Sequence, residues 1–186
     1  GLSVGSIAGS VGFNTRPRQP GETGPRVHDL VFHDLTTQMG GGQMKLTGTG
    51  KLTNLLLSKL DTNEFDVSLV SDNADLRYGR QMRGKLNGSV RLHRLNNPPE
   101  GGGPEKQAHL DGTMTLTQAD LALAPPKVAE AAQYLGLSNR LPAPVMNVAL
   151  NVGSSVLLRG MGITVPLATG PAARITGTPQ LPRIAG

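Results

Sequence analysis

The sequence predicts a mainly β fold, a curled open sheet of antiparallel or mixed strands that forms a trough and carries one short helix. Apolar and polar residues alternate over most of the chain, which is typical of strands with one dry and one solvated face. Large rings are scarce, with three Phe, two Tyr and no Trp among 186 residues, and 25 Gly are present. A thin sheet with one apolar side is therefore expected in preference to a densely packed closed core.

Alternation is strictest in six stretches, which we expect to be strands: 43–52, 64–70, 84–92, 109–116, 145–152 and 162–167. A register slip of one residue would move every apolar side chain into water, so the pairing is well specified. In the last four stretches the apolar positions share one side of each strand. The residues expected to line the trough are Leu86, Val90, Leu92, Leu110, Met114, Leu116, Met146, Val148, Leu150, Val152, Ile163, Val165 and Leu167.

A short motif recurs in these strands: an apolar residue, any residue, Gly, and then Ser or Thr. It occurs at 46–49, 86–89, 110–113 and 175–178. Gly inside a strand marks a bend or a close approach of two backbones. We therefore expect a curved sheet with an incompletely filled apolar side, onto which these glycines fall: Gly48, Gly88, Gly112 and Gly177.

Four stretches interrupt the alternation and are expected to be loops or turns: 14–26, 71–75, 96–107 and 168–174. A short helix is expected near 126–136. Pro126 suits its first turn, where the missing N–H costs nothing, and Gly136 suits its C-terminal cap. This helix would either pack its apolar side on the sheet or plug one end of it.

The charge and composition exclude several classes of protein. The formal net charge is +5, but the basic residues are scattered apart from a cluster over 77–85, where Tyr78 is the only aromatic residue. Binding of single-stranded nucleic acid requires several stacking aromatics, so nucleic acid is not expected as a partner. The chain contains no Cys, which excludes disulfides and thiolate metal sites. It has no apolar run of 18 residues, and it begins within a pattern, as expected of a fragment of a longer protein.

The sequence gives no reason to expect an enzyme, a cofactor or a metal site. His28 and His33 are five residues apart on a predicted strand, so their side chains should point to opposite faces. The acidic stretch 72–75 lacks the Gly and the final Glu of a calcium loop. The Gly triplets at 40–42 and 101–103 are not followed by the Lys and Ser or Thr of a phosphate-binding loop, and no Ser lies in a nucleophile elbow.

Two other β architectures are alternatives to the open trough. A transmembrane barrel also alternates, but it needs aromatic girdles at both interfaces, which three Phe and two Tyr cannot form. A closed sandwich with an aliphatic core and no ligand is the other alternative, and it would leave no continuous groove.

The C-terminal stretch 154–186 contains an ordered pattern: an apolar-Arg-Gly strand, a Gly-apolar-x-apolar strand, a turn, and then a strand pair with Gly-Thr-x-x-x-Pro. It is carried by Val156, Leu158, Arg159, Gly160, Gly162, Ile163, Val165, Leu167, Ile175, Gly177, Thr178, Pro182, Ile184 and Gly186. The pattern resembles the repeats of the TamB family, subunits of the translocation and assembly module, and of the AsmA-like, bridge-like lipid-transfer proteins. The likeness covers Gly40 to Gly186 and includes the strands 84–92 and 110–123 and the Pro-started helix.

This resemblance implies a β-taco, a trough whose apolar lining shields and conducts phospholipid acyl chains between membranes. It implies a location in the periplasm or cell envelope, a parent protein anchored in the inner membrane, and a role in outer-membrane biogenesis and protein secretion. The implied partners are phospholipid, adjacent segments of the parent chain and an outer-membrane barrel protein similar to TamA. Residues 1–186 would then be a single fragment of a longer trough. A structural or strand-donating scaffold for outer-membrane protein assembly, without lipid binding, is the alternative.

Overall fold

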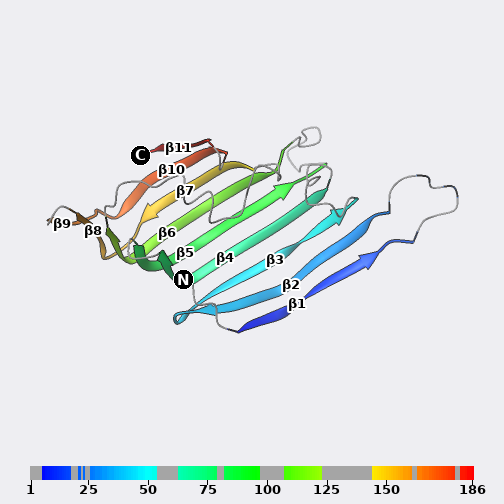
Figure 1. The fold of residues 1–186 in the computed structure, drawn as a ribbon, viewed down its shortest axis with the longest axis horizontal. Helices are drawn as coiled ribbons and strands as arrows, with labels where there is room; N and C mark the ends of the chain where they lie inside the picture. The colour runs from blue at the N-terminus through cyan, green and yellow to red at the C-terminus, as the bar shows by residue number, and fades with distance from the viewer. Residues whose placement is uncertain are drawn as a thin grey trace.

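The computed structural model describes residues 6–17, 21, 23, 26–53, 63–78, 82–96, 107–122, 144–160, 163–178 and 181–186. In these residues every regular element is a strand, and the strands form one open, curled 11-stranded sheet (Figure 1). The prediction of a mainly β, open sheet is confirmed. The helix expected near 126–136 lies outside the described residues. The strands are β1 (Ile7–Thr15), β2 (His28–Met39), β3 (Gly42–Leu52), β4 (Glu64–Tyr78), β5 (Met82–Arg94), β6 (His109–Ala122), β7 (Val145–Val152), β8 (Val156–Gly160), β9 (Ile163–Pro166), β10 (Gly170–Thr178) and β11 (Leu181–Ala185).

The sheet is mixed, and three of its described strands, β1, β9 and β11, lie at an edge. From β1 to β6 each strand pairs antiparallel with the next, after which β7 and β8 both run parallel to β6, and the path ends with β10 and β11. β7 and β8 follow one another alongside β6, and between them the Gly153 N–H donates to the Leu116 carbonyl at 2.8 Å. β1 and β11 lie at opposite edges and do not pair with each other, so the sheet stays open (Figure 1).

The register places alternate residues of neighbouring strands on a common side of the sheet. Leu116 lies between Leu86 of β5 and Val152 of β7, and all three point to the side that we call the apolar face. The opposite side, which we call the polar face, carries cross-strand neighbours such as Arg91 and Asp111. The period-two pattern thus gives each strand one apolar and one polar side, as the sequence predicts.

Bulges interrupt the parity of several strands. The predicted turn at 71–75 is wrong, because β4 runs continuously through it with a register shift between Ser71 and Ala74. Asn73 takes the extra position with φ 50°, and its N–H donates to Asn87 Oδ1 at 2.8 Å. An extra residue in a bulge lets apolar positions on either side of it share one face. The polar side chains of 71–75 therefore accommodate an irregularity inside a strand instead of ending it.

The other predicted loops are partly correct. Asn14 and Thr15 belong to β1, and the segment that follows is closed by a bond from the Arg16 N–H to the Val27 carbonyl at 3.0 Å. The turn expected over 168–174 is shorter than predicted, because β10 already begins at Gly170. Of the expected loop 96–107, the structure describes the first and last residues, Asn96 and Gln107, and both lie outside the strands.

The described strands bury few side chains completely. The largest buried cluster consists of Ala119, Val152 and Val156, with Leu116 and Leu167 among the half-buried residues packed against it. Apolar side chains are far more exposed on β1, β9 and β11, the strands with a single neighbour, where the exposed fractions are 53% for Phe13, 63% for Ile163 and 71% for Ile184. The sheet therefore relies on its hydrogen-bond ladders and cross-strand pairs, with one small cluster where β6, β7 and β8 meet.

Candidate functional site: the apolar face

The predicted trough-lining residues all lie on the apolar face. Four rows cross β5, β6 and β7 at this face: Leu86–Leu116–Val152, Gly88–Met114–Leu150, Val90–Gly112–Val148 and Leu92–Leu110–Met146. β8 and β9 extend the face, because Leu121 pairs with Leu158 and Leu158 with Val165. Ile163 lies opposite Gly160, and Leu167 packs against the cluster around Val156. Residues from separate stretches of the sequence therefore form one continuous aliphatic surface.

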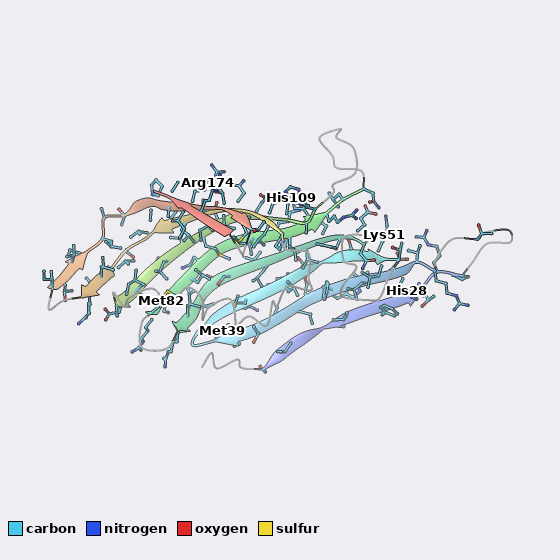
Figure 2. The ribbon with its side chains drawn as sticks, turned by 45° about the horizontal axis from the view of Figure 1, so that its top comes forward. His28, Met39, Lys51, Met82, His109 and Arg174 are labelled. Atoms are coloured by element: carbon cyan, nitrogen blue, oxygen red, sulfur yellow. The ribbon has the colours of Figure 1, made fainter. Side chains whose placement is uncertain are left out.

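The centre of this surface is shielded and its margins are open. Met114, Val148 and Val152 are 7%, 8% and 9% exposed, whereas Val165 on β9 is 46% exposed. In Figure 2, Met39 and Met82 lie toward one end of the strands and Lys51, His28 and His109 toward the other. The apolar face thus extends along the whole length of the strands between these ends.

The four predicted strand glycines also lie on this face, but they have a more specific cause than an unfilled space, since all four have a positive φ. Gly48 and Gly88 have φ values of 146° and 127°, which side chains of L-residues rarely allow. A methyl group on Gly48 would overlap the Asp66 carbonyl oxygen, and one on Gly88 would overlap the Thr113 carbonyl oxygen. These glycines allow close approach of neighbouring backbones, and Gly112 does the same on β6, where a methyl group would overlap the Ser89 carbonyl oxygen. Gly177 lies in the corresponding row of β10.

Several residues of the apolar face were missing from the predicted lining, some of them because bulges shift the parity. On β2, Phe32 and Leu35 both lie on this face, since the register shifts between them. On β6, a bulge at Gln118, with φ 47°, brings Ala119 onto the same side as Leu116. The further members are Val11, Phe13, Leu30, Phe32, Leu35, Leu46, Phe65, Val67, Leu69, Ala74, Leu76, Ala119, Leu121, Val156, Leu158 and Ile175.

The polar face is organised as cross-strand pairs. Arg91 donates to both carboxylate oxygens of Asp66 at 2.6 and 2.7 Å, and this hydrogen bonding, with the charge of Arg91, holds the pKa of Asp66 below its usual value despite partial burial. His93 Nε2 lies 2.9 Å from Asp111 Oδ2, and its ring stacks on His109 with centroids 5.5 Å apart. These groups satisfy one another and keep the outer side of the sheet solvated.

No group of three His, Cys, Asp or Glu residues in the described ranges is arranged to hold a metal ion. His28 and His33 lie on opposite faces, and the His28 ring stacks on Phe13 with centroids 5.2 Å apart. A hollow of about 230 Å³ near the strand ends is lined by Arg16, Val27, Lys51, Thr53, Glu64 and Asn96.

The chemistry available to the apolar face is the burial of hydrocarbon. Its side chains are mainly apolar, aliphatic on β5 to β9 and joined by one Phe on each of β1, β2 and β4. The hydroxyl of Ser71, one of its few polar groups, already donates to the Leu86 carbonyl at 2.9 Å. A ligand on this surface would be held by contact area, because few hydrogen-bonding groups are available to fix its position.

Among the described residues, none forms a helix long and apolar enough to cross a membrane. Comparison of the chain with known proteins found no matching family model, no matching curated protein and no matching solved structure.

Proposed function

We propose that this chain is a segment of a non-enzymatic hydrophobic trough of the TamB type, which shields and conducts phospholipid acyl chains between membranes. The observation that carries the proposal is the single apolar face of an open, curled sheet. An exposed apolar surface of this length is unusual for a soluble protein and is typical of a surface that binds a partner or a lipid.

The energetics of the apolar face suit acyl chains. Each methylene that is fully removed from water contributes about 0.8 kcal/mol, so about ten methylenes contribute about 8 kcal/mol. The aliphatic lining offers this contribution along the whole strand length, from Leu110 to Leu121 on β6. Since few hydrogen bonds must break when a chain advances, the same surface can both hold the chain and let it slide.

The setting of such a trough follows from the resemblance to the TamB family and is part of the proposal. The chain would act in the periplasm or cell envelope, within a parent protein anchored in the inner membrane, and would support outer-membrane biogenesis. Adjacent segments of that parent protein would pair with the edge strands β1 and β11, each of which has one neighbour in the described part of the sheet. A barrel protein similar to TamA would be its partner at the outer membrane.

Native mass spectrometry of protein purified without detergent tests the proposal, with phospholipid adducts as the expected result. Leu150→Asp should abolish these adducts, because Leu150 lies half-buried on the apolar face. Ala149→Asp is the matched control, since the neighbouring side chain points to the polar face opposite Thr113 and Arg174. Leu150→Gln provides a milder second variant if the charge impairs folding. Loss of lipid in both Asp variants, or in neither, would contradict the proposal.

A strand-donating scaffold is the second candidate function, favoured by the open edges β1 and β11. Edge strands with unpaired backbone groups can add to the sheet of a client protein. This function predicts that purified protein carries no lipid, and that proline substitutions on β11, which remove backbone donors, abolish client binding.

A further inference from the structure

The end of the sheet that contains the last residues of β4 and β6 and the first residues of β5 has an unusual charge distribution. We call its polar-face cations Arg77, Arg83, Lys85 and Arg159 the basic tip. Arg77 and Arg83 are direct cross-strand partners, an arrangement in which like charges destabilise a sheet.

Arg83 and Lys85, two members of the basic tip, lie opposite Asp120 and Asp75 in the register but form no ion pair with these carboxylates. Arg159 Nε donates to Asp120 Oδ1 at 2.5 Å, and Arg77 lies 3.9 Å from Asp75 Oδ2. No ion pair within the described residues involves Arg83 or Lys85. Elsewhere on the polar face Lys45, Lys51 and Arg91 are each paired with a carboxylate. The tip therefore has an excess positive charge that its own sheet does not neutralise.

The apolar face at the same end is exposed. β9, which is joined to β6 through β8, is exposed along its whole length, and Ile163 and Val165 are 63% and 46% exposed. This end of the sheet has cations without an ion pair on one face and exposed aliphatic side chains on the other. The two faces match the interface of an anionic bilayer, where phosphates and acyl chains lie within a few ångströms of each other.

We propose that this end of the sheet docks on an anionic lipid bilayer, with the basic tip on the headgroup phosphates and Ile163 and Val165 at the acyl boundary. Single-stranded nucleic acid fits less well, because it needs stacking aromatics instead of aliphatic side chains. The proposal requires only the groups at this end and is independent of what the rest of the apolar face holds.

Vesicle flotation with the whole chain tests the docking. The wild type should bind vesicles that contain phosphatidylglycerol at low salt and should bind pure phosphatidylcholine vesicles weakly. Since each basic residue near an anionic surface contributes about 1 kcal/mol, which is about fivefold, the double variant R83Q/K85Q should lower the partition coefficient about 25-fold. I163S/V165S should reduce the part of the binding that persists at high salt, where surface charges are screened.

The matched control is R26Q/R183Q, which removes the same net charge from exposed cations outside the tip. The control should retain most of the binding. Equal losses in the two double variants would overturn the proposal, because binding would then depend on overall charge alone. Inorganic phosphate that releases the protein from vesicles more than chloride does at equal ionic strength would also overturn the proposal, in favour of a free-phosphate site. Binding of single-stranded DNA that depends on the tip and is as strong as vesicle binding would overturn it in favour of nucleic acid.

A stability measurement separates docking from a structural role. Arg83 lies between Arg77 of β4 and Asp120 of β6, so the repulsion and the attraction that Arg83→Gln removes oppose each other. This substitution should therefore leave the urea midpoint nearly unchanged while it weakens vesicle binding. A fall in stability that parallels the loss of binding would contradict the docking role. The lipid adducts expected in native mass spectrometry should be unaffected in R83Q/K85Q, so failure of the docking proposal is distinguishable from failure of the trough proposal.

Discussion

The comparison of Gly48→Ala with Gly50→Ala tests why glycines recur on the apolar face. Both residues lie on β3 and on the same face, two positions apart. A methyl group on Gly48 would lie 2.6 Å from Val67 Cα and still closer to the Asp66 carbonyl oxygen, and its φ is 146°. At Gly50 the nearest atoms would be 3.6–3.7 Å away, which is ordinary contact, and no unusual φ is present.

The magnitude follows from two costs and one gain. Forcing a non-Gly residue into this backbone region costs about 1–3 kcal/mol, and overpacking against a neighbouring backbone costs about 1–3 kcal/mol. The reduced entropy of the unfolded chain returns about 0.4–1 kcal/mol. Gly48→Ala should therefore lower the free energy of unfolding by about 2–4 kcal/mol. Gly50→Ala should leave it unchanged or raise it by up to about 1 kcal/mol.

Urea unfolding followed by far-UV circular dichroism measures this difference, provided that the two variants keep the same m value. Equal destabilisation by both substitutions would refute the reasoning, because it would mean that the apolar face excludes any added methyl group. Near-neutral behaviour of both would show that the backbone at Gly48 can relax away from β4.

Three further predictions concern stability. The pKa of Asp66 is depressed by Arg91, so its ionised form stabilises the fold above the ordinary carboxyl pKa, and this contribution is lost as the pH falls through the lower folded value. Asp66→Asn should thus lower the free energy of unfolding at pH 7, by less than about 1 kcal/mol for such an exposed pair. In urea unfolding this difference should vanish in strong acid, and a difference independent of pH would contradict the assignment. Val156→Ala should lower the free energy of unfolding by about 1–3 kcal/mol, since Val156 is 1% exposed within the cluster of β6, β7 and β8. A thermal or urea midpoint equal to that of the wild type would be evidence against that cluster. Asn73→Gly should leave the free energy of unfolding nearly unchanged, whereas Asn73→Ala should lower it by about 1 kcal/mol because of the positive φ. Equal urea midpoints for the two variants would argue against the bulge.

The period-two pattern predicted the shared face but could not predict where its parity changes. Strict alternation on 84–92, 109–116 and 145–152 was enough to place Leu86, Leu116 and Val152 in one row. The bulges depend on single backbone conformations, such as φ 47° at Asp34 and Gln118, and neither residue is the Gly that would mark such a position in a sequence.

Strand order was also beyond the sequence pattern. The parity of β7 is the same whether it runs parallel or antiparallel to β6, so alternation could not reveal that the two strands are parallel. The polar cross-strand pairs, such as Asp66 with Arg91, depend on register and became visible only once the strands were aligned.

Site-specific photo-crosslinking in the presence of phospholipid vesicles tests the central claim most directly. A photoreactive residue at Leu150 or Met114, on the apolar face, should give lipid adducts. The same residue at Asn151 or Thr115, which pair with each other on the polar face, should give none. Adducts of equal yield on both faces, or on the polar face alone, would contradict the account.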